Sequence, residues 1–162
     1  MDRPGAYEGM PLPNQLLARS ARRFPLLTKF LRRITRGMIL DDPEKSVRRV
    51  MSSVPETDKA VLFAPENVEI FSQSLREGLR QGYQGVAQDD ILVNRDWGFD
   101  PRHIKLRIDI WHGDADVTVP VHAGKFLHDA LPHSRVVFLP GEGHFFILKS
   151  WQEILSILVD EG

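Results

Sequence analysis

The chain has 162 residues, enough for one domain of ordinary size, and its 42% apolar and 27% charged composition excludes a disordered protein. A formal net charge of −1 argues against a nucleic-acid partner, and the lack of cysteine excludes a disulfide scaffold or a cysteine-ligated zinc site. No stretch approaches the ~20 apolar residues of a membrane span, and the N-terminus does not have the pattern of a signal peptide. A reducing cytoplasm is the simplest location to expect for a chain without cysteine.

The first part of the chain, to about residue 90, has the periodicity of α-helices. Pro25 suits the first turn of a helix whose apolar residues recur on one face: Leu27, Phe30, Leu31, Ile34 and Met38. Basic residues lie on the opposite face: Lys29, Arg32, Arg33 and Arg36. We expect the apolar stripe to face the body of the protein. Because seven basic residues and no acidic one lie between Glu8 and Asp41, a membrane-surface or partner-binding helix is the alternative interpretation.

Two further helix starts follow. Asp42 is a typical N-cap with Pro43 at the first helical position. Pro65 opens a segment whose apolar residues form one stripe: Val68, Phe71, Leu75 and Leu79. We expect Gly82 and Gly85 to end that second helix. No strand pattern occurs in this part, so residues 1–90 are predicted to be a helical unit.

The rest of the chain, residues 91–162, changes character. LRIDIWHG is a short run with β-forming residues that ends at Gly113, and SRVVFLP is a continuous apolar run, as expected for a buried parallel strand. A helical segment follows each, and the second of these is long and rich in apolar residues. Strand, helix, strand, helix is the order found in a parallel sheet. In such sheets, functional side chains gather in the loops after the carboxyl ends of the strands. Asp114 and Asp116 follow the first predicted strand, and His144 follows the second.

The segment IDIWHGDADVTVPVHAGKFLHDALPHSRVVFLPGEGHFF resembles the last third of an α/β-hydrolase. That family has a strand followed by H-G-x-x-D-x-x-V-P, a helix, a second strand and G-x-G-H, and the resemblance covers roughly residues 90–158. The WGF sequence at 97–99 also fits the approach to the first of these strands. The resemblance implies an α/β fold class: residues 91–162 would form the C-terminal part of the α/β-hydrolase core, and residues 1–90 a helical lid or cap.

The resemblance also implies roles for two residues. Asp116 would be the acid of a catalytic triad and His144 its general base, in the chain order that the family uses. The chemistry explains these residue types. An imidazole must take the proton of a weakly nucleophilic hydroxyl, and a buried carboxylate must hold that imidazole in one tautomer. Gly143 would allow a tight turn beside the histidine, and Pro120 would start the following helix.

Simpler interpretations exist for the neighbouring residues. An aspartate after a strand is often a turn residue, and we expect this role for Asp114. His112 belongs to the resembling stretch but not to the implied triad. The HGDAD stretch could suggest a metal site, but no second cluster with ligand spacing accompanies it, so we expect neither a metal nor a cofactor.

The nucleophile is missing from the sequence. The family places a serine in G-x-S-x-G at a sharp strand-to-helix turn, and none of the nine serines lies in that motif. We therefore expect a fragment of a longer hydrolase, with a subunit of a split enzyme and a non-catalytic remnant as alternatives. With only two clear strands, such a chain is expected to self-associate, to pair with a missing half or to aggregate.

Carboxylic-ester or acyl hydrolysis of a small-molecule substrate is the expected reaction, and an apolar substrate pocket is expected beneath the lid. Relatives with an aspartate nucleophile, the dehalogenases and epoxide hydrolases, use the same acid and base and are an alternative. A binding module that uses the basic amphipathic helix, without hydrolysis, is the alternative from another class. The chain alone is expected to be inactive.

Overall fold

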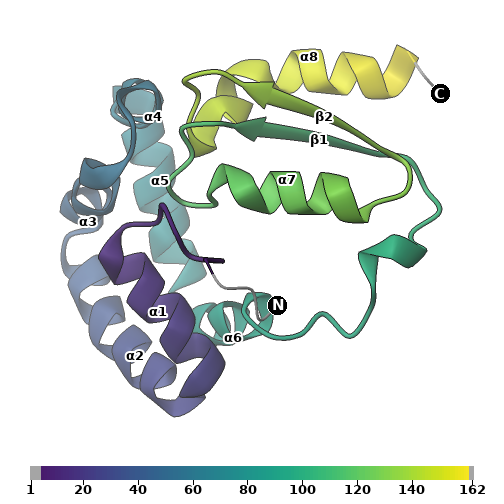
Figure 1. Ribbon diagram of the computed structural model, residues 1–162. Helices are drawn as coiled ribbons and strands as arrows, with labels where there is room; N and C mark the ends of the chain where they lie inside the picture. Colours follow the sequence, from purple (N-terminus) through teal and green to yellow (C-terminus); the bar gives the residue numbers. More distant parts are fainter. Residues whose placement is uncertain (1–4, 161–162) are drawn as a thin grey trace.

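The computed structural model describes the backbone of residues 5–160, and the side chains of the same range except at positions 50, 51, 158 and 160. Helices fill the first part of the chain (Figure 1). They are α1 (Leu12–Arg23), α2 (Pro25–Asp41), α3 (Pro43–Val50), the 3-10 turn η1 (Met51–Ser53), α4 (Glu56–Leu62), α5 (Pro65–Gly78) and α6 (Gln84–Val93).

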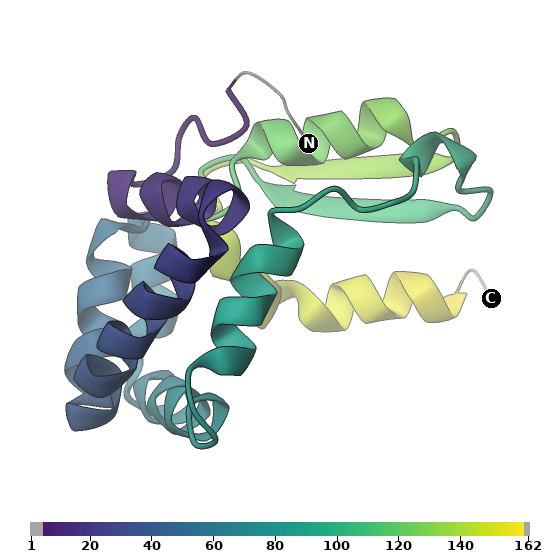
Figure 2. The ribbon, with the colours of Figure 1, turned by 90° about the horizontal axis from the view of Figure 1, so that it is seen from below.

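The second part is built around a small parallel sheet. Its elements are η2 (Pro101–His103), β1 (Ile108–Gly113), α7 (Val121–Ala130), β2 (Ser134–Leu139), η3 (His144–Phe146) and α8 (Ile147–Asp160). The two strands pair in parallel, with Ile108 opposite Ser134 and Gly113 opposite Leu139. Figures 1 and 2 show α7 on one face of this sheet and α8 on the other. The arrangement is that of an α/β unit with three layers.

The predicted order of strand, helix, strand and helix is confirmed in this second part. Gly113 ends β1 as expected, and Pro120 precedes the first residue of α7. Along η3 and α8, the expected apolar face is covered unevenly, since Phe146 in η3 is buried and Leu155 in α8 is exposed. The side chain of Leu158, which was expected on the same face, lies outside those that the structure describes.

The expected orientation of α2 is wrong. Its apolar stripe faces outward, and Phe30 is 58% exposed. The side of α2 that packs against other helices is polar: Thr28 is fully buried, and Arg32 binds the carboxylate of Asp90 on α6, with Nη2 and Oδ1 2.9 Å apart. Small residues fill this interface: Ala18, Ser20, Ala21 and Ala87 are all buried. Because small side chains let helices approach closely, α1, α2 and α6 pack without using the large apolar residues of the stripe.

Two helices, α4 and α6, were not expected from the sequence. α4 begins at Glu56 after Pro55, the same Pro-Glu pattern that starts the next helix at Pro65. The predicted helix from Pro65 exists, but it ends at Gly78, before the glycines that were expected to close it. Gly85 instead lies inside α6. A glycine near the start of a helix costs little, since the first turn has fewer backbone hydrogen bonds to lose.

The carboxyl ends of both strands point toward the helical part (Figure 1). α4 contacts η3, so the helical part touches the segment that contains His144. Among residues 5–160, no helix combines the length and the apolar character needed to cross a bilayer.

Candidate active site

Two loops meet at the carboxyl edge of the sheet. We call residues 114–120 after β1 the acid loop, and residues 140–145 after β2 the base loop. Backbone bonds hold the acid loop in place: the Asp114 amide donates to the carbonyl of Leu139 at the end of β2 at 3.1 Å, and the Ala115 amide donates to the carbonyl of Glu142 in the base loop at 3.0 Å. Gly113 lies at their junction, where a Cβ would overlap the backbone of Glu142. A glycine is required there because the two chains approach closely.

The acid loop holds the carboxylate of Asp116 through its own backbone. Asp116 is 7% exposed, and its Oδ1 accepts hydrogen bonds from the amides of Thr118 at 2.7 Å and Val119 at 2.8 Å. A side chain that accepts from amides two and three residues ahead closes a tight local turn. Oδ2 remains available and lies 2.8 Å from Nδ1 of His144.

His144 completes the pair that the sequence analysis singled out, and the expected proximity to Asp116 is confirmed. An ionised carboxylate only accepts, so Nδ1 must carry the proton and Nε2 is left with a lone pair. The His144 side chain is 38% exposed, and no hydrogen-bond partner of Nε2 occurs among residues 5–160. The imidazole therefore presents an unoccupied proton acceptor at the edge of the sheet.

The two groups shift each other's proton affinity. The hydrogen bond to Asp116 raises the pKa of His144 above its ordinary value of 6.5; burial opposes the increase, and the charges of Asp116 and Asp58 add to it. Burial acts to raise the pKa of Asp116, but hydrogen bonds from His144, Val119 and Thr118 outweigh burial, and the pKa ends below its ordinary value. The carboxylate stays ionised at neutral pH, and it stabilises the imidazolium that would form if Nε2 accepted a proton.

Asp114 and His112 support the acid loop and are not part of the pair. Oδ1 of Asp114 accepts from the amide of Gly141 at 2.7 Å, so this carboxylate ties the acid loop to the base loop as a turn residue. The ring of His112 lies 2.8 Å from the carbonyl of Val119 through Nε2. Its Nε2 is 3.8 Å from Oδ2 of Asp116, beyond hydrogen-bond range.

One residue at the site was missed in the sequence. Asp58 on α4 is 1% exposed and accepts hydrogen bonds from the backbone amides of His144 and Phe145, each at 2.9 Å. The Pro-Glu pattern before it could have indicated the helix. Nothing local could have indicated the contact, because 86 residues separate Asp58 from His144.

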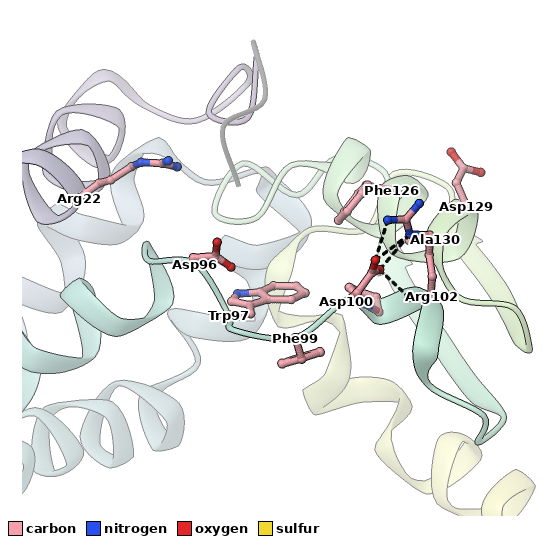
Figure 3. Close-up of a pocket in the computed structure, with 10 residues that line it drawn as sticks. Arg22, Asp96, Trp97, Phe99, Asp100, Arg102, Phe126, Asp129 and Ala130 are labelled. Atoms are coloured by element: carbon pink, nitrogen blue, oxygen red, sulfur yellow. Dashed lines mark hydrogen bonds and ion pairs between the residues drawn. The ribbon is translucent and has the colours of Figure 1, made fainter.

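A separate cavity of about 770 Å³ lies between α1, the segment before β1 and α7. Figure 3 shows its walls: Trp97 and Phe99 stack with ring centroids 5.6 Å apart, and Asp100 pairs with Arg102. The hydrogen bonds from Arg102 hold the pKa of Asp100 at about 2. Neither Asp116 nor His144 lines this cavity.

Metal ligands do not gather at the site. No group of three or more His, Asp or Glu side chains suited to a metal ion occurs in the part of the chain that the structure describes. None of the nine serines in the sequence lies in G-x-S-x-G. The hydrogen-bonded pair of Asp116 and His144 therefore occurs without a recognisable nucleophile motif in the sequence.

Among solved structures, the chain is similar to a bromoperoxidase from Bacillus anthracis, an enzyme with an α/β-hydrolase fold. The match has a TM-score of 0.53 and 20% sequence identity, and it covers 76% of this chain and 45% of the bromoperoxidase. The chain thus spans less than half the length of that enzyme. No protein-family model and no curated protein matches the sequence. The likeness shows an α/β-hydrolase-like fold.

Proposed function

We propose that the chain provides the acid and base of an α/β-hydrolase that cleaves carboxylic esters, with Asp116 as the acid and His144 as the general base. The observation that carries this proposal is the 2.8 Å hydrogen bond between Nδ1 of His144 and the buried carboxylate of Asp116. It leaves Nε2 unpaired among the described residues and half-exposed, as a base that must meet a substrate or a nucleophile requires.

The proposed reaction is acyl transfer in two steps. Nε2 of His144 removes the proton of a serine hydroxyl as the oxygen attacks the acyl carbonyl, and Asp116 stabilises the imidazolium. The imidazolium then protonates the departing alcohol, and water releases the acid in the second step by the same route. The serine and the oxyanion donors would come from residues outside this chain, either from a longer polypeptide or from a partner subunit.

The helical part fits the role of a lid in this proposal. The carboxyl ends of both strands point toward it (Figure 1), and α4 contacts η3, which begins at His144. A helical cover at this edge would exclude water from an acyl pocket. An enzyme with an aspartate nucleophile, such as a dehalogenase or an epoxide hydrolase, would use the same acid and base to activate water. This alternative differs from the ester proposal only in the identity of the nucleophile.

The test is activity in the longer protein. The in-frame coding sequence before Met1 should encode a G-x-S-x-G motif, and the longer chain should hydrolyse p-nitrophenyl acetate. His144→Ala should lower kcat by about six orders of magnitude, as expected for loss of the triad histidine. Chain 1–162 alone should show no turnover above its own His144→Ala variant.

Two results would contradict the proposal. One is a longer enzyme that retains full activity with His144→Ala. The other is the absence of the motif, combined with a single monomer boundary in sedimentation velocity and a cooperative thermal transition of residues 1–162. Such a chain would complete its own core without a partner that could supply the serine.

A second candidate function is binding to an anionic membrane surface, and the exposed stripe of α2 favours it. Phe30 and its apolar neighbours on α2 are exposed, and two exposed basic residues, Lys29 and Arg33, lie on the same helix. An apolar face accompanied by positive charge is typical of helices that lie in the headgroup region of a bilayer. In this interpretation the chain would bind without catalysis, and His144 would be dispensable.

Vesicle co-sedimentation separates this candidate from the first. Binding to phosphatidylserine vesicles that weakens with salt and is lost in the Lys29→Glu/Arg33→Glu double variant would support it. Arg32 is unsuitable for this test because it is paired with Asp90. The matched control is Lys45→Glu/Arg49→Glu on α3, which makes the same charge change elsewhere. Absent or equal binding by all three proteins would exclude this candidate.

A further inference from the structure

The helix that begins at His144 has no capping side chain of its own. η3 starts at His144 and α8 continues from Ile147, while the residue at the N-cap position is Gly143. The first amides of a helix lack intrahelical acceptors, so a partly buried helix start needs acceptors from elsewhere. Asp58 on α4 supplies them: Oδ2 accepts from the amide of His144 and Oδ1 from the amide of Phe145.

Both oxygens of Asp58 are used, which explains why an aspartate suits this position. A carboxylate accepts at each oxygen, whereas an asparagine would accept at one and present an NH₂ group to the other amide. The negative charge also favours the positive end of the helix that it caps. Because Asp58 is 1% exposed, water cannot readily replace either bond.

Gly143 is the complementary part of this contact. A Cβ at position 143 would overlap the carboxylate of Asp58. The backbone of Gly143 has an extended conformation that any residue can adopt, so the glycine is needed for space and not for conformational freedom. The tight approach of Asp58 to the base loop therefore accounts for the glycine before His144.

Two more contacts tie the base loop to the helical part. Oγ1 of Thr57 donates to the carbonyl of Gly141 at 3.0 Å. The ring of Phe71 on α5 meets the ring of Phe145 edge-on, with centroids 5.6 Å apart. Thr57, Asp58 and Phe71 thus form an anchor that holds the base loop from two helices of the other part of the molecule.

We propose that Asp58 is a positioning residue for His144, which sets the place of its imidazole relative to Asp116 by capping the helix start from the helical part. The inference rests on the proposed function in one respect, which is that His144 takes part in a reaction and its position therefore matters. It implies that α4 belongs with the site as a fixed support. Any movement of the helical part during a reaction would then leave α4 in place, or would displace the base.

Charges around the imidazole provide a readout that does not require turnover. Asp116 and Asp58 are the acidic groups that act on His144, and the charge of Asp58 adds to the increase of the His144 pKa. His112 has its Nε2 3.8 Å from Oδ2 of Asp116, and its ring is bonded to the carbonyl of Val119. Removal of the Asp58 charge should therefore lower the pKa of His144.

The experiment is an NMR titration of chain 1–162 labelled with ¹³C at the histidine rings, together with amide exchange. In Asp58→Asn, the pKa of His144 should fall, and the amides of His144 and Phe145 should exchange about tenfold faster, as expected when a buried hydrogen bond to a charged group is lost. Asp114→Asn is the matched control, because its one bond to Gly141 can be kept by the amide oxygen. Thr57→Val weakens the same anchor without changing a charge, so it should leave the pKa unchanged.

An unchanged pKa and unchanged exchange in Asp58→Asn would overturn the inference. If that variant does not fold, Gly143→Ala tests the same contact with Asp58 still present, because the new Cβ would overlap its carboxylate. The amides of His144 and Phe145 should then exchange faster, whereas Gly37→Ala, which has no atom near its Cβ, should leave their exchange unchanged. Equal exchange of these two amides in both variants would also overturn the inference. These readouts do not involve catalysis, so they are separate from the esterase test of His144→Ala.

Discussion

The acid loop and the base loop end neighbouring strands, but they are held in different ways. Asp116 is fixed by amides two and three residues further along its own loop. His144 is fixed by Asp58, which lies 86 residues earlier in the chain on α4. The acid loop is therefore a local structure that its own residues can form. The base loop depends on the packing of the helical part, and it should be the first of the two to lose its geometry when that packing weakens.

The variant with the largest expected effect disrupts the acid loop and the base loop together, because it changes the residue at their junction. Gly113→Ala should lower the free energy of unfolding by about 3 kcal/mol, because the new Cβ would overlap backbone atoms of Glu142 and backbone cannot move aside as a side chain can. Urea unfolding measures the loss. Gly37→Ala is the control: no atom lies near its Cβ in α2, and it should be neutral or stabilise by about 0.5–1 kcal/mol. Equal behaviour of the two variants would contradict the close approach of the loops.

A smaller effect is expected from a change at the contact between the loops. Asp116→Asn should lower the free energy of unfolding by about 2 kcal/mol through loss of a hydrogen bond to a charged group. The amide would keep its oxygen toward Thr118 and Val119 and turn its NH₂ group toward His144, which favours the wrong imidazole tautomer. NMR titration should show the pKa of His144 falling toward 6.5. A pKa that stays raised would mean that Asp116 is not its main partner.

The stability that this pair provides should depend on pH in a defined window. Asp116 has a lowered pKa when folded, so its contribution is present above its ordinary value of 3.8 and is lost as pH falls through the lowered value. His144 has a raised pKa, so its contribution is present below 6.5 and is lost as pH rises through the raised value. The difference in unfolding free energy between the parent and Asp116→Asn should be greatest between about pH 4 and 6.5. A difference that is constant from pH 4 to 9 would contradict this coupling.

The smallest expected effect tests the base loop alone. Thr57→Val removes the hydrogen bond to the carbonyl of Gly141 while keeping the shape of the side chain. It should cost about 0.5–1 kcal/mol in urea unfolding, because the bond is near the surface and water can replace it. Amide exchange should increase in the base loop and remain unchanged in the acid loop. Equal increases in both loops would show that they open as one unit.

Sequence patterns predicted the structure of the second part of the molecule better than that of the helical part. The strands and helices of residues 108–160 follow short runs of β-forming or apolar residues and turn residues, which act over short distances, and they were predicted correctly in type and order. The helix from Pro25 was also predicted, but its buried side was not. A large apolar stripe normally marks the packed face of a helix. Here the ion pair of Arg32 with Asp90 and the small residues between α1, α2 and α6 decide which face is inside.

The sequence by itself placed Asp114, Asp116 and His144 after predicted strands whose carboxyl ends must meet at one edge of a parallel sheet, and the resemblance to α/β-hydrolases implied which of them are the candidate acid and base. It also showed that none of the nine serines lies in G-x-S-x-G, since a short motif can be searched for directly. Only the tertiary structure revealed Asp58 and the outward stripe of α2. Both depend on contacts between residues far apart in the chain, and such contacts leave no periodicity or spacing that a single sequence can display.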